Sequence, residues 1–320
     1  MHPASFFKLS VRVQRGCIKQ REVFMKTAGI IGLGDMGSGL AKNLINHGFA
    51  TTVFDLSEER VKAFTDLGGQ AAQSVAEVAA NSNHVYVMVM NGDQARSVIL
   101  GEDGLVNNMT KGSTILLTAT IKPSEARAIG EAMTGCGINL IDSPVSGGFP
   151  GAQSGTLTMM AAGNNDVMAA NHDVMKAVSA TIHHVGQNAG EGQTVKACLQ
   201  SLIGSIFSAT FEASALAAKA GVSGEVLYNV FSSSGAGCGV ANTALENIID
   251  RQFEDTGSHI NTMHKDLTIC LNLAEELGVP MQTASSAMQV FHAGKSKYPN
   301  GDNWICTRVI EEIIGAELHR

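Results

Sequence analysis

The chain has no surplus of basic residues, and this absence argues against nucleic acid as a partner. Lys and Arg number 22 among the 320 residues, against 29 Asp and Glu, which gives a formal net charge of −7. Proteins that bind nucleic acid neutralise phosphates with Lys and Arg, and this composition has no excess of them to offer. We therefore expect no nucleic-acid partner.

Paired cysteines are also absent. The six cysteines are scattered and include no Cys-x-x-Cys pair, a spacing that many zinc sites use. The histidines supply no zinc motif either, because His183-His184 and the pair His259 and His264 lack the His-x-x-x-His spacing of a helical site. We therefore expect no metal. Scattered thiols of this kind are typical of a reducing compartment, and we predict a cytoplasmic location.

No apolar run reaches the ~18 uncharged residues of a membrane span, so we expect no membrane association. Hydrophobic residues still make up 44% of the chain and charged residues 16%, which suffices for a sizeable core. A length of 320 residues fits two domains. Residues 1–24 carry several basic residues and no acid before Glu22, and we expect a loosely ordered leader there rather than a true targeting sequence.

A glycine-rich turn near the start of the chain indicates a dinucleotide site. Residues 26–32 (KTAGIIG) read as a buried strand that runs into the sequence GLGDMG, and a helix and a second strand follow. The first glycine permits a tight bend, the second lets a pyrophosphate approach the backbone, and the third allows close packing of helix on strand. The pyrophosphate then lies at the N-terminus of the helix. We predict cofactor-binding roles for Gly32, Gly34, Asp35, Met36 and Gly37.

Asp55 ends the second strand, about twenty residues after these glycines. A carboxylate at this place accepts hydrogen bonds from the adenosine ribose hydroxyls and would repel a 2′-phosphate. Leu56-Ser57-Glu58-Glu59 follow, with no basic cluster to hold that phosphate, so we predict NAD rather than NADP as the cofactor. Asp55 could also cap the helix that begins at Ser57, and the two roles are compatible.

Strands and helices alternate from residue 26 to residue 185, the pattern of a Rossmann-type, doubly wound α/β sheet. Loops after the strands of such a sheet face the ligand crevice, and we therefore predict cofactor contacts for Met90, Asn91 and Thr120. After residue 190 only helical patterns follow. We expect an NAD-binding domain over residues 25–189 and an all-α domain over residues 190–320 for substrate binding and oligomerisation, joined by a long helix.

The joining helix is predicted over Gly190–Gly221. Its apolar stripe recurs at alternating steps of four and three residues and consists of Val195, Leu199, Leu202, Ile206, Ala209, Ala213 and Leu216. We expect this stripe to pack into the second domain. Lys196 and Gln200 lie four residues apart and share one face of the helix. On the pattern alone, Lys196 is either a core-helix lysine whose ammonium reaches solvent or a functional group.

Ser146, Gly147 and Gly148 follow one another in the segment DSPVSGGFPGA. They expose backbone N–H groups and a hydroxyl with no side-chain bulk between them. A turn of this kind can hold a carboxylate by several short hydrogen bonds. On the residues alone, it is equally a glycine-rich connection between two strands.

Four motifs occur in order along the chain: GLGDMGSGLAKNL, DSPVSGGFPGAQSGTLTMMAAG, GEGQTVKACLQ and HKDLTICLNLAEELGVP. Together they resemble the 3-hydroxyisobutyrate dehydrogenase (β-hydroxyacid dehydrogenase) family, and the resemblance runs from residue 26 to the C-terminus. It implies a Rossmann domain followed by an all-helical domain that builds a dimer or tetramer. It also implies hydride transfer between NAD(P) and a short hydroxy acid. We therefore expect a hydroxy-acid substrate and a homodimer or homotetramer.

Carried over by position, the resemblance implies roles for single residues. Ser146, Gly147 and Gly148 match the segment that holds the substrate carboxylate, and Lys196 matches the family's catalytic lysine. Thr120 matches the threonine beside the nicotinamide. Lys265, in the Lys-Asp-Leu motif, matches the lysine near the bound cofactor, whereas its neighbour Asp266 could equally be an acid on the helix surface.

Two departures from the family pattern bear on the substrate. The family usually has two asparagines at the third and fourth places after the catalytic lysine, where this chain has Leu199 and Gln200. Gln200 keeps a polar amide with a longer reach, so we predict that it orients the substrate. Together with residues 89–104 it resembles the L-threonate dehydrogenase branch, which oxidises the hydroxyl next to the carboxylate. The presence of Lys196 argues against the related imine reductases, which typically replace this lysine.

The alternatives that remain concern the substrate and the presence of catalysis. Residue types do not separate threonate from 3-hydroxyisobutyrate or similar acids, and a tartronate-semialdehyde or sulfolactaldehyde-type reductase of the same family fits the same motifs. A non-catalytic NAD-binding sensor is an alternative of a different class.

Oxidation of an alcohol requires a general base, and a lysine with a reference pKa of about 10.4 serves only if burial or nearby positive charge lowers its pKa.

Overall fold

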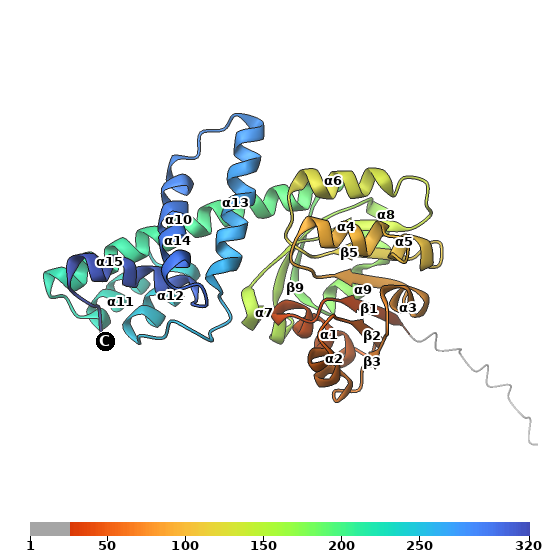
Figure 1. Cartoon of the computed structure of the whole chain (residues 1–320), viewed down its shortest axis with the longest axis horizontal. Coiled ribbons are helices and arrows are strands. Elements are labelled where there is room, and N and C mark those ends of the chain that lie inside the picture. The colour runs from red at the N-terminus through yellow and green to blue at the C-terminus, as the bar shows by residue number, and fades with distance from the viewer. Residues whose placement is uncertain (1–25) are drawn as a thin grey trace, which may run out of the picture.

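The computed structural model describes residues 26–320, so the predicted leader over residues 1–24 lies outside the described residues. Figure 1 shows two lobes, a sheet with helices on both faces and a helical lobe, with one long helix, α10, running from the first into the second. The predicted fold class, a Rossmann-type sheet followed by an all-α part, is confirmed.

Six parallel strands form the body of the sheet in the order β3-β2-β1-β4-β5-β6. They are β1 (Thr27–Ile31), β2 (Ala50–Phe54), β3 (Gln70–Ala71), β4 (His84–Val87), β5 (Thr114–Leu117) and β6 (Asn139–Asp142). The chain reverses direction across the sheet between β1 and β4. Ligands of doubly wound sheets bind at the carboxyl ends of the strands beside such a reversal.

Three further strands extend the sheet beyond β6. β8 (Leu157–Ala162) is antiparallel to β6 and to the two-residue strand β7 (Val145–Ser146), and β9 (Ser179–Gly186) is parallel to β8. A short helix, α7 (Gly148–Ser154), follows β7. The segment that reads as a possible glycine-rich connection is therefore a strand and a helix.

One predicted helix is two helices in the structure. The sequence favours a single helix over residues 165–180, but α8 (Asn165–Ala170) ends at Asn171, and α9 (His172–Lys176) begins there. Asn171 is buried, and its Nδ2 donates to Thr114 Oγ1 at 3.1 Å and to the Val167 carbonyl at 2.8 Å. The bond to Thr114 of β5 holds Asn171 against the sheet at the break, a contact that residue pattern alone does not reveal.

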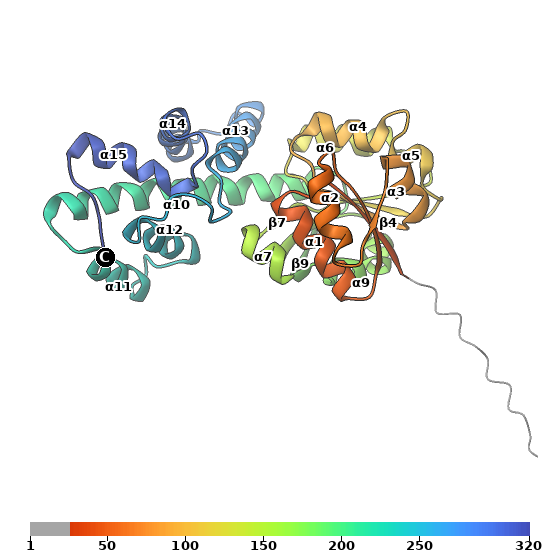
Figure 2. The ribbon, with the colours of Figure 1, turned by 60° about the horizontal axis from the view of Figure 1, so that its bottom comes forward.

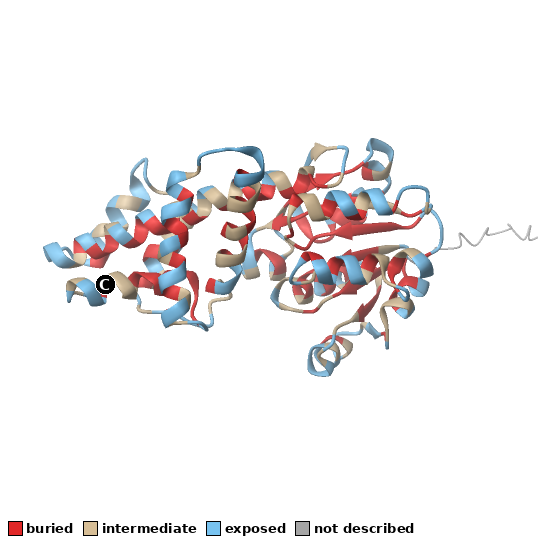
Figure 3. Ribbon diagram, turned by 45° about the horizontal axis from the view of Figure 1, so that its top comes forward, coloured by how far each residue is buried: buried red, intermediate tan, exposed pale blue. Residues whose placement is uncertain are grey.

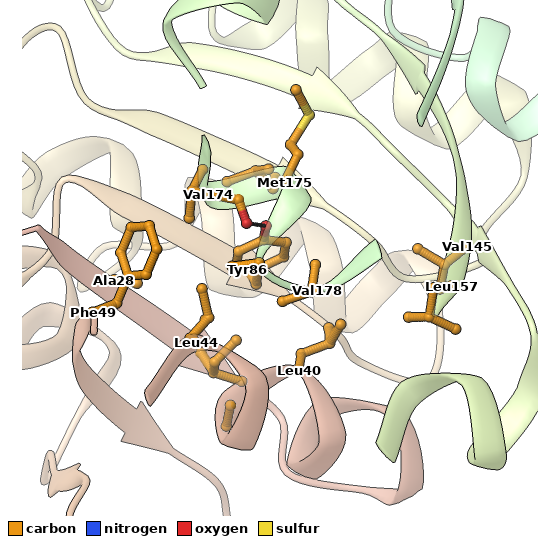
Figure 4. Packing of buried hydrophobic residues seen from close by; sticks show 14 of the residues in the cluster. Ala28, Leu40, Leu44, Phe49, Tyr86, Val145, Leu157, Val174, Met175 and Val178 are labelled. Atoms are coloured by element: carbon orange, nitrogen blue, oxygen red, sulfur yellow. Dashed lines mark hydrogen bonds between the residues drawn. The ribbon is translucent and has the colours of Figure 1, made fainter. Parts of the chain in front are cut away.

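The remaining helices cover the two faces of the sheet with separate apolar clusters. They are α1 (Asp35–Asn46), α2 (Glu58–Thr65), α3 (Val75–Asn81), α4 (Gly92–Leu100), α5 (Leu105–Asn108) and α6 (Pro123–Ala132). On β4, Tyr86 enters the cluster on the α1 face while Val85 and Val87 enter the other. Figure 4 shows Tyr86 among Leu40 and Leu44, with its hydroxyl donating to the Val174 carbonyl at 2.7 Å.

Every named element after β9 is helical. These are α10 (Glu191–Ala220), α11 (Gly224–Ser233), α12 (Gly239–Ile249), α13 (Ile260–Leu277), α14 (Gln282–Lys297), the 3-10 turn η1 (Asn303–Ile305) and α15 (Cys306–Ile314). In Figure 2, α11 and α12 lie on one side of α10, and α13, α14 and α15 lie on the other. Phe207, Phe211, Phe291 and Trp304 pack together in the core of this lobe. A domain boundary between residues 189 and 190 stays our proposal.

The predicted packing of α10 is wrong. Along the apolar stripe, Val195, Leu202, Ala209 and Leu216 are exposed, with Leu202 at 59% and Leu216 at 73%. The helix instead buries the opposite face, on which small and polar residues let its neighbours approach. A Cβ at Gly204, for example, would lie 2.7 Å from Leu267 of α13. Figure 3 shows buried and exposed faces alternating along this helix.

The expectation that no run resembles a membrane span also needs correction. Among the described residues, α10 is long and apolar enough to cross a membrane, with a mean hydropathy of 1.3 over its best window. Its buried face, however, carries Lys196, Gln200, Ser208 and Ser214 and packs against other helices of the same lobe. A lipid-spanning helix would present apolar residues on all sides, so α10 is a core helix of this lobe.

Candidate active site

A cavity of about 830 Å³ opens between the two lobes. The sheet lobe contributes loops at the carboxyl ends of its strands, and the helical lobe contributes α10, α12 and α13. The lining includes Asp35, Met36, Met88, Thr118, Thr120, Ser146, Gly147 and Gly148 from the first lobe, and Lys196, Gln200, Thr243, Asn247, His259, Asp266 and Trp304 from the second. The cavity therefore brings Lys196 and all the predicted substrate residues together with three predicted cofactor residues, Asp35, Met36 and Thr120. The other predicted cofactor residues do not line it: Gly32, Gly34, Gly37, Asp55, Met90, Asn91 and Lys265.

The glycine-rich turn has the shape that a dinucleotide requires. Gly32 has φ +95°, and a Cβ there would lie 2.1 Å from the Met88 carbonyl oxygen. A Cβ at Gly37 would lie 1.8 Å from the Gly32 carbonyl oxygen. A Cβ at Gly34 would have no atom within 4 Å, so open space lies beside the backbone at the start of α1. The turn thus fits a pyrophosphate at the helix N-terminus.

Asp55 fastens this turn to the end of β2. Its Oδ2 accepts from the Leu33 N–H at 2.6 Å, and its Oδ1 accepts from the Ser57 N–H at 2.8 Å. Ser57, whose hydroxyl accepts from the Arg60 N–H, is the N-cap of α2, so Asp55 does not cap this helix. Each carboxylate oxygen has a second lone pair with which to accept from a ribose hydroxyl.

Met90 and Asn91 do not line the cavity. Met90 is 63% exposed, and Asn91 caps α4 by accepting from the Gln94 N–H at 2.9 Å. Their predicted cofactor contacts stay predictions, and the cavity wall on this side is formed by Met88 and Thr118, which the sequence reasoning missed. Met88 directly follows β4, and Thr118 directly follows β5. At such positions the sequence pattern alone does not show which side chain faces the crevice.

Thr120 and Lys265 meet across the boundary between the lobes. Lys265 Nζ, on α13, donates to the Thr120 carbonyl oxygen at 2.9 Å, and it lies 3.3 Å from Asp266 Oδ1. Thr120 lines the cavity. The lysine therefore ties the loop after β5 to the helical lobe beside the cofactor crevice.

The Ser-Gly-Gly segment faces the same cavity. Gly147 has φ +132° and Gly148 has φ +60°, conformations that favour glycine. A Cβ at Gly147 would also lie 3.1 Å from Leu157 Cδ2. The backbone N–H groups of this turn and the Ser146 hydroxyl are thus free of side-chain bulk, as a carboxylate-binding turn requires.

Lys196 is 6% exposed and lines the cavity. Burial lowers the pKa of its ammonium, Asp266 opposes this shift, and the positive charge of Lys265 adds to it. A lysine with a lowered pKa exchanges protons more readily near neutral pH. The interpretation of Lys196 as a snorkelling lysine is not favoured, because its side chain ends in the cavity wall and not in bulk solvent.

Gln200 and Asp266 form a hydrogen-bonded pair, and the sequence predicted a role for Gln200 only. Gln200 is 6% exposed, and its Nε2 donates to Asp266 Oδ2 at 2.5 Å. Asp266 is 3% exposed, so the alternative of a helix-surface acid is wrong. The carboxylate on α13 holds the amide of Gln200 on α10, one helical turn from Lys196.

A second polar network positions the start of α10. Asp142, fully buried at the end of β6, accepts from the N–H groups of Gly190 and Gln193 and from Gln193 Nε2. Gln193 also bridges to the loop after β5, donating to the Ala119 carbonyl and accepting from the Ile121 N–H. Burial raises the pKa of Asp142 to about 6, against the lowering effect of these hydrogen bonds. Sequence reasoning missed the role of Gln193, although this residue lies in the GEGQTVKACLQ motif, because its partners Asp142, Ala119 and Ile121 are far from it in the chain.

The rest of the wall is largely apolar, with Phe149, Val240 and Met263 as examples, and Thr243 and Asn247 of α12 add uncharged polar groups. Among residues 26–320, no three His, Cys, Asp or Glu side chains gather as metal ligands would. A bare glycine turn at a Rossmann switch point, opposite a buried lysine with a lowered pKa, defines the class of nicotinamide-dependent dehydrogenases.

Comparison with known proteins agrees with this class. Residues 27–186 match a protein-family model described as the NAD binding domain of 6-phosphogluconate dehydrogenase, and residues 190–310 match one described as NAD-binding of NADP-dependent 3-hydroxyisobutyrate dehydrogenase. An L-threonate dehydrogenase of Cupriavidus necator is 31% identical, over 92% of this chain and 98% of that protein. The mitochondrial 3-hydroxyisobutyrate dehydrogenase of Mus musculus is 30% identical, over 87% and 84%.

A solved structure of 3-hydroxyisobutyrate dehydrogenase from Salmonella typhimurium superposes with a TM-score of 0.81, at 29% identity, over 89% of this chain and 99% of that one. The chain belongs to the 3-hydroxyisobutyrate dehydrogenase family. It is an NAD-dependent hydroxyacid dehydrogenase, and the predicted family, enzyme class and cofactor are confirmed.

Proposed function

We propose that the protein oxidises a four-carbon sugar acid of the L-threonate type, with Lys196 as the acid/base group. The observation that carries this proposal is the position of Lys196, buried in the wall of the cavity that Ser146, Gly147 and Gly148 also line. A small acid held by its carboxylate in that turn would bring its hydroxyl close to the lysine. Bound NAD would accept the hydride from the carbon that bears this hydroxyl.

The residues of the chain would divide the remaining work between binding and proton transfer. The N–H groups of Gly147 and Gly148 and the Ser146 hydroxyl hold the carboxylate. Neutral Lys196 takes the hydroxyl proton as the C–H bond breaks, and the ammonium so formed can polarise the carbonyl in the reverse reaction. Gln200, whose Nε2 is engaged by Asp266, keeps Oε1 as an acceptor for a substrate hydroxyl.

The relatives support the substrate class without separating its members. L-threonate dehydrogenases from four bacterial strains are 29% to 31% identical to this chain, and the mouse 3-hydroxyisobutyrate dehydrogenase is 30% identical. Gln200 supports threonate, because its amide suits a hydroxylated chain better than a methyl group. Thr243 and Asn247 offer further polar groups in a wall that also holds apolar side chains such as Val240 and Met263.

The test is a rate screen. Oxidation with NAD is compared for L-threonate, its epimer erythronate, 3-hydroxyisobutyrate and glycerate, and reduction with NADH is measured for tartronate semialdehyde and sulfolactaldehyde. We expect the largest kcat/KM for L-threonate and a product with its carbonyl next to the carboxylate. A higher value for 3-hydroxyisobutyrate, or for either aldehyde, would move the assignment to that substrate. NADH binding with no turnover of any compound would favour the non-catalytic sensor.

We also propose that a second copy of the chain covers the apolar stripe of α10. Val195, Leu202, Ala209 and Leu216 are exposed at intervals of seven residues, and Leu199, Ile206 and Ala213 lie between them half-buried. This is the repeat with which one helix packs along another, and a two-fold axis lets each copy supply the same seam. Isolated monomers rarely expose such a continuous apolar face. A homodimer, or a homotetramer built from such pairs, follows.

A cytoplasmic location stays part of the proposal. Cys136, Cys198, Cys238, Cys270 and Cys306 are all free thiols in the described part of the chain, which suits a reducing compartment. Fractionation of cells that express the tagged full-length chain would test this location.

A further inference from the structure

His259 lies between two carboxylates that belong to different lobes. Its Nε2 is 3.3 Å from Asp35 Oδ2 of the glycine-rich turn, and its Nδ1 is 3.5 Å from Asp302 Oδ1 of the helical lobe. Both ring nitrogens thus face carboxylate oxygens. His259 also lines the cavity between the lobes.

The loop that carries His259 is held rigidly from behind. Asp302 is fully buried and accepts from the Thr256 N–H at 2.7 Å, from the Thr256 hydroxyl at 2.5 Å and from the Ser258 N–H at 3.2 Å. Three donors on one carboxylate fix the backbone of residues 256–258. The helical lobe therefore holds the backbone next to His259 without any contribution from Asp35.

The same loop touches the sheet lobe at a second point. Gly257 has φ +78°, and a Cβ there would lie 2.7 Å from Cβ of Phe149, which directly follows the Ser-Gly-Gly turn. Residues 257–259 thus contact both the cofactor turn and the predicted substrate turn. This loop forms part of the cavity wall where the two lobes meet.

Asp35 poses an electrostatic problem for a dinucleotide. It is the first residue of α1, the helix whose N-terminus receives the pyrophosphate, and its side chain is half exposed in the cavity wall. A carboxylate beside two phosphates repels them unless a cation lies close to it. Among the described residues, His259 is the basic side chain that lies within 4 Å of the Asp35 carboxylate.

We propose that His259 is a cofactor-positioning residue, which the helical lobe supplies to neutralise Asp35 and so admit the pyrophosphate of the dinucleotide. The role differs from that of the glycine turn, because it makes cofactor affinity depend on contact between the lobes. It rests on the confirmed cofactor class and not on the choice of substrate.

The experiment measures the Kd of NADH by fluorescence for wild type, His259→Gln, Asp35→Asn and the double variant. We expect His259→Gln to raise the Kd about fivefold at low ionic strength, because the Asp35 charge is then uncompensated. Asp35→Asn should bind at least as tightly as wild type. In the double variant the Kd should return to within about twofold of the wild-type value, since no charge remains to neutralise.

Three comparisons make the result specific. His319→Gln is the matched control, because His319 Nε2 also lies 3.3 Å from a carboxylate, that of Glu317, but does not line the cavity. Adenosine, which has no phosphate, should bind His259→Gln and wild type equally, whereas ADP-ribose should follow NADH. Added salt should reduce the effect of His259→Gln on the Kd.

The proposal is overturned by an unchanged Kd in His259→Gln, or by an equal loss of affinity with and without Asp35→Asn. An equal loss for adenosine and ADP-ribose would also overturn it, because it would indicate a structural defect. Thermal unfolding of each variant identifies such a defect independently. Turnover is not needed for any of these measurements, so they are separate from the test of the substrate.

Discussion

Gln200 Nε2 donates to Asp266 Oδ2 at 2.5 Å, and this bond joins α10 to α13 within one helical turn of Lys196. A carboxylate only accepts, so the bond orients the amide with its nitrogen toward Asp266 and leaves its oxygen for another donor. Asp266 also raises the pKa of Lys196, against the larger effect of burial. One buried acid thus influences both the orientation of a substrate-facing amide and the titration of the proposed base.

Asp266→Asn tests both effects at once. An asparagine can donate to Gln200 and turn its amide, so we expect kcat/KM to fall about tenfold or more, the size of a lost charged hydrogen bond. Loss of the negative charge should further lower the pKa of Lys196, so the rise of kcat/KM with pH should move to lower pH. A merely structural defect would reduce the rate without moving the pH profile. NADH affinity serves as the control and should stay within about twofold.

The pH dependence of wild type reports on Lys196 itself. Oxidation needs the neutral amine, so kcat/KM for oxidation should rise with pH and level off above a pKa that lies below the ordinary lysine value of 10.5. Reduction needs the ammonium, so its rate should fall over the same range. Lys196→Ala should abolish turnover while the Kd of NADH stays nearly unchanged. Retention of most of kcat in this variant would exclude Lys196 as the acid/base group.

Asp55 is predicted to make NAD the preferred cofactor. Steady-state rates with NAD and NADP should differ at least tenfold in kcat/KM, about 1.4 kcal/mol, because a 2′-phosphate would meet the carboxylate. Arg60 Nη1 lies 3.9 Å from Asp55 Oδ1, so Asp55→Ser would release a basic side chain toward that phosphate. We expect this variant to lose NAD activity and gain NADP activity. A wild-type preference for NADP would contradict the role of Asp55.

Leu202→Glu tests the proposed pairing of two α10 helices. Charges in the centre of the seam should dissociate the assembly, and light scattering after gel filtration should show a mass close to that of the 33.5 kDa chain. Leu67→Glu is the matched control, because Leu67 is 57% exposed and Leu202 is 59% exposed, but Leu67 lies just after α2 in the sheet lobe. A monomeric wild type, or an unchanged mass in Leu202→Glu, would count against the seam.

Asp142 should make stability depend on pH. Its pKa is raised from 3.8 to about 6 in the folded protein, so the folded state binds more protons than the unfolded state between these values. The free energy of unfolding should therefore fall as pH rises from about 4 to about 6, by up to about 3 kcal/mol relative to Asp142→Asn, which does not titrate. Denaturant titrations of both proteins at several pH values measure this difference. Parallel curves would show that Asp142 does not titrate in this range.

Much of the cofactor half of the site could be predicted from the sequence, because its determinants are local. Strand, glycine turn, helix and second strand follow one another within residues 26–55, and the three glycines are needed by contacts inside this unit, such as that of Gly37 with the Gly32 carbonyl. Lys196 and Gln200 were likewise placed on one face by helical spacing alone. These relationships depend on backbone geometry over a few residues, which the order of residues determines.

The tertiary structure decided what each local element faces. Periodicity showed that α10 has an apolar stripe, but the other helices pack on its opposite side, so that Val195, Leu202 and Leu216 of the stripe are exposed. Asp266 could be a surface acid or a buried partner until α13 was placed against α10. The contacts of Asp142 with Gln193 and of Asp35 with His259 join residues far apart in the chain. Periodicity is a property of one helix, whereas burial and charge pairing depend on which other elements pack against it, and only the assembled fold determines that.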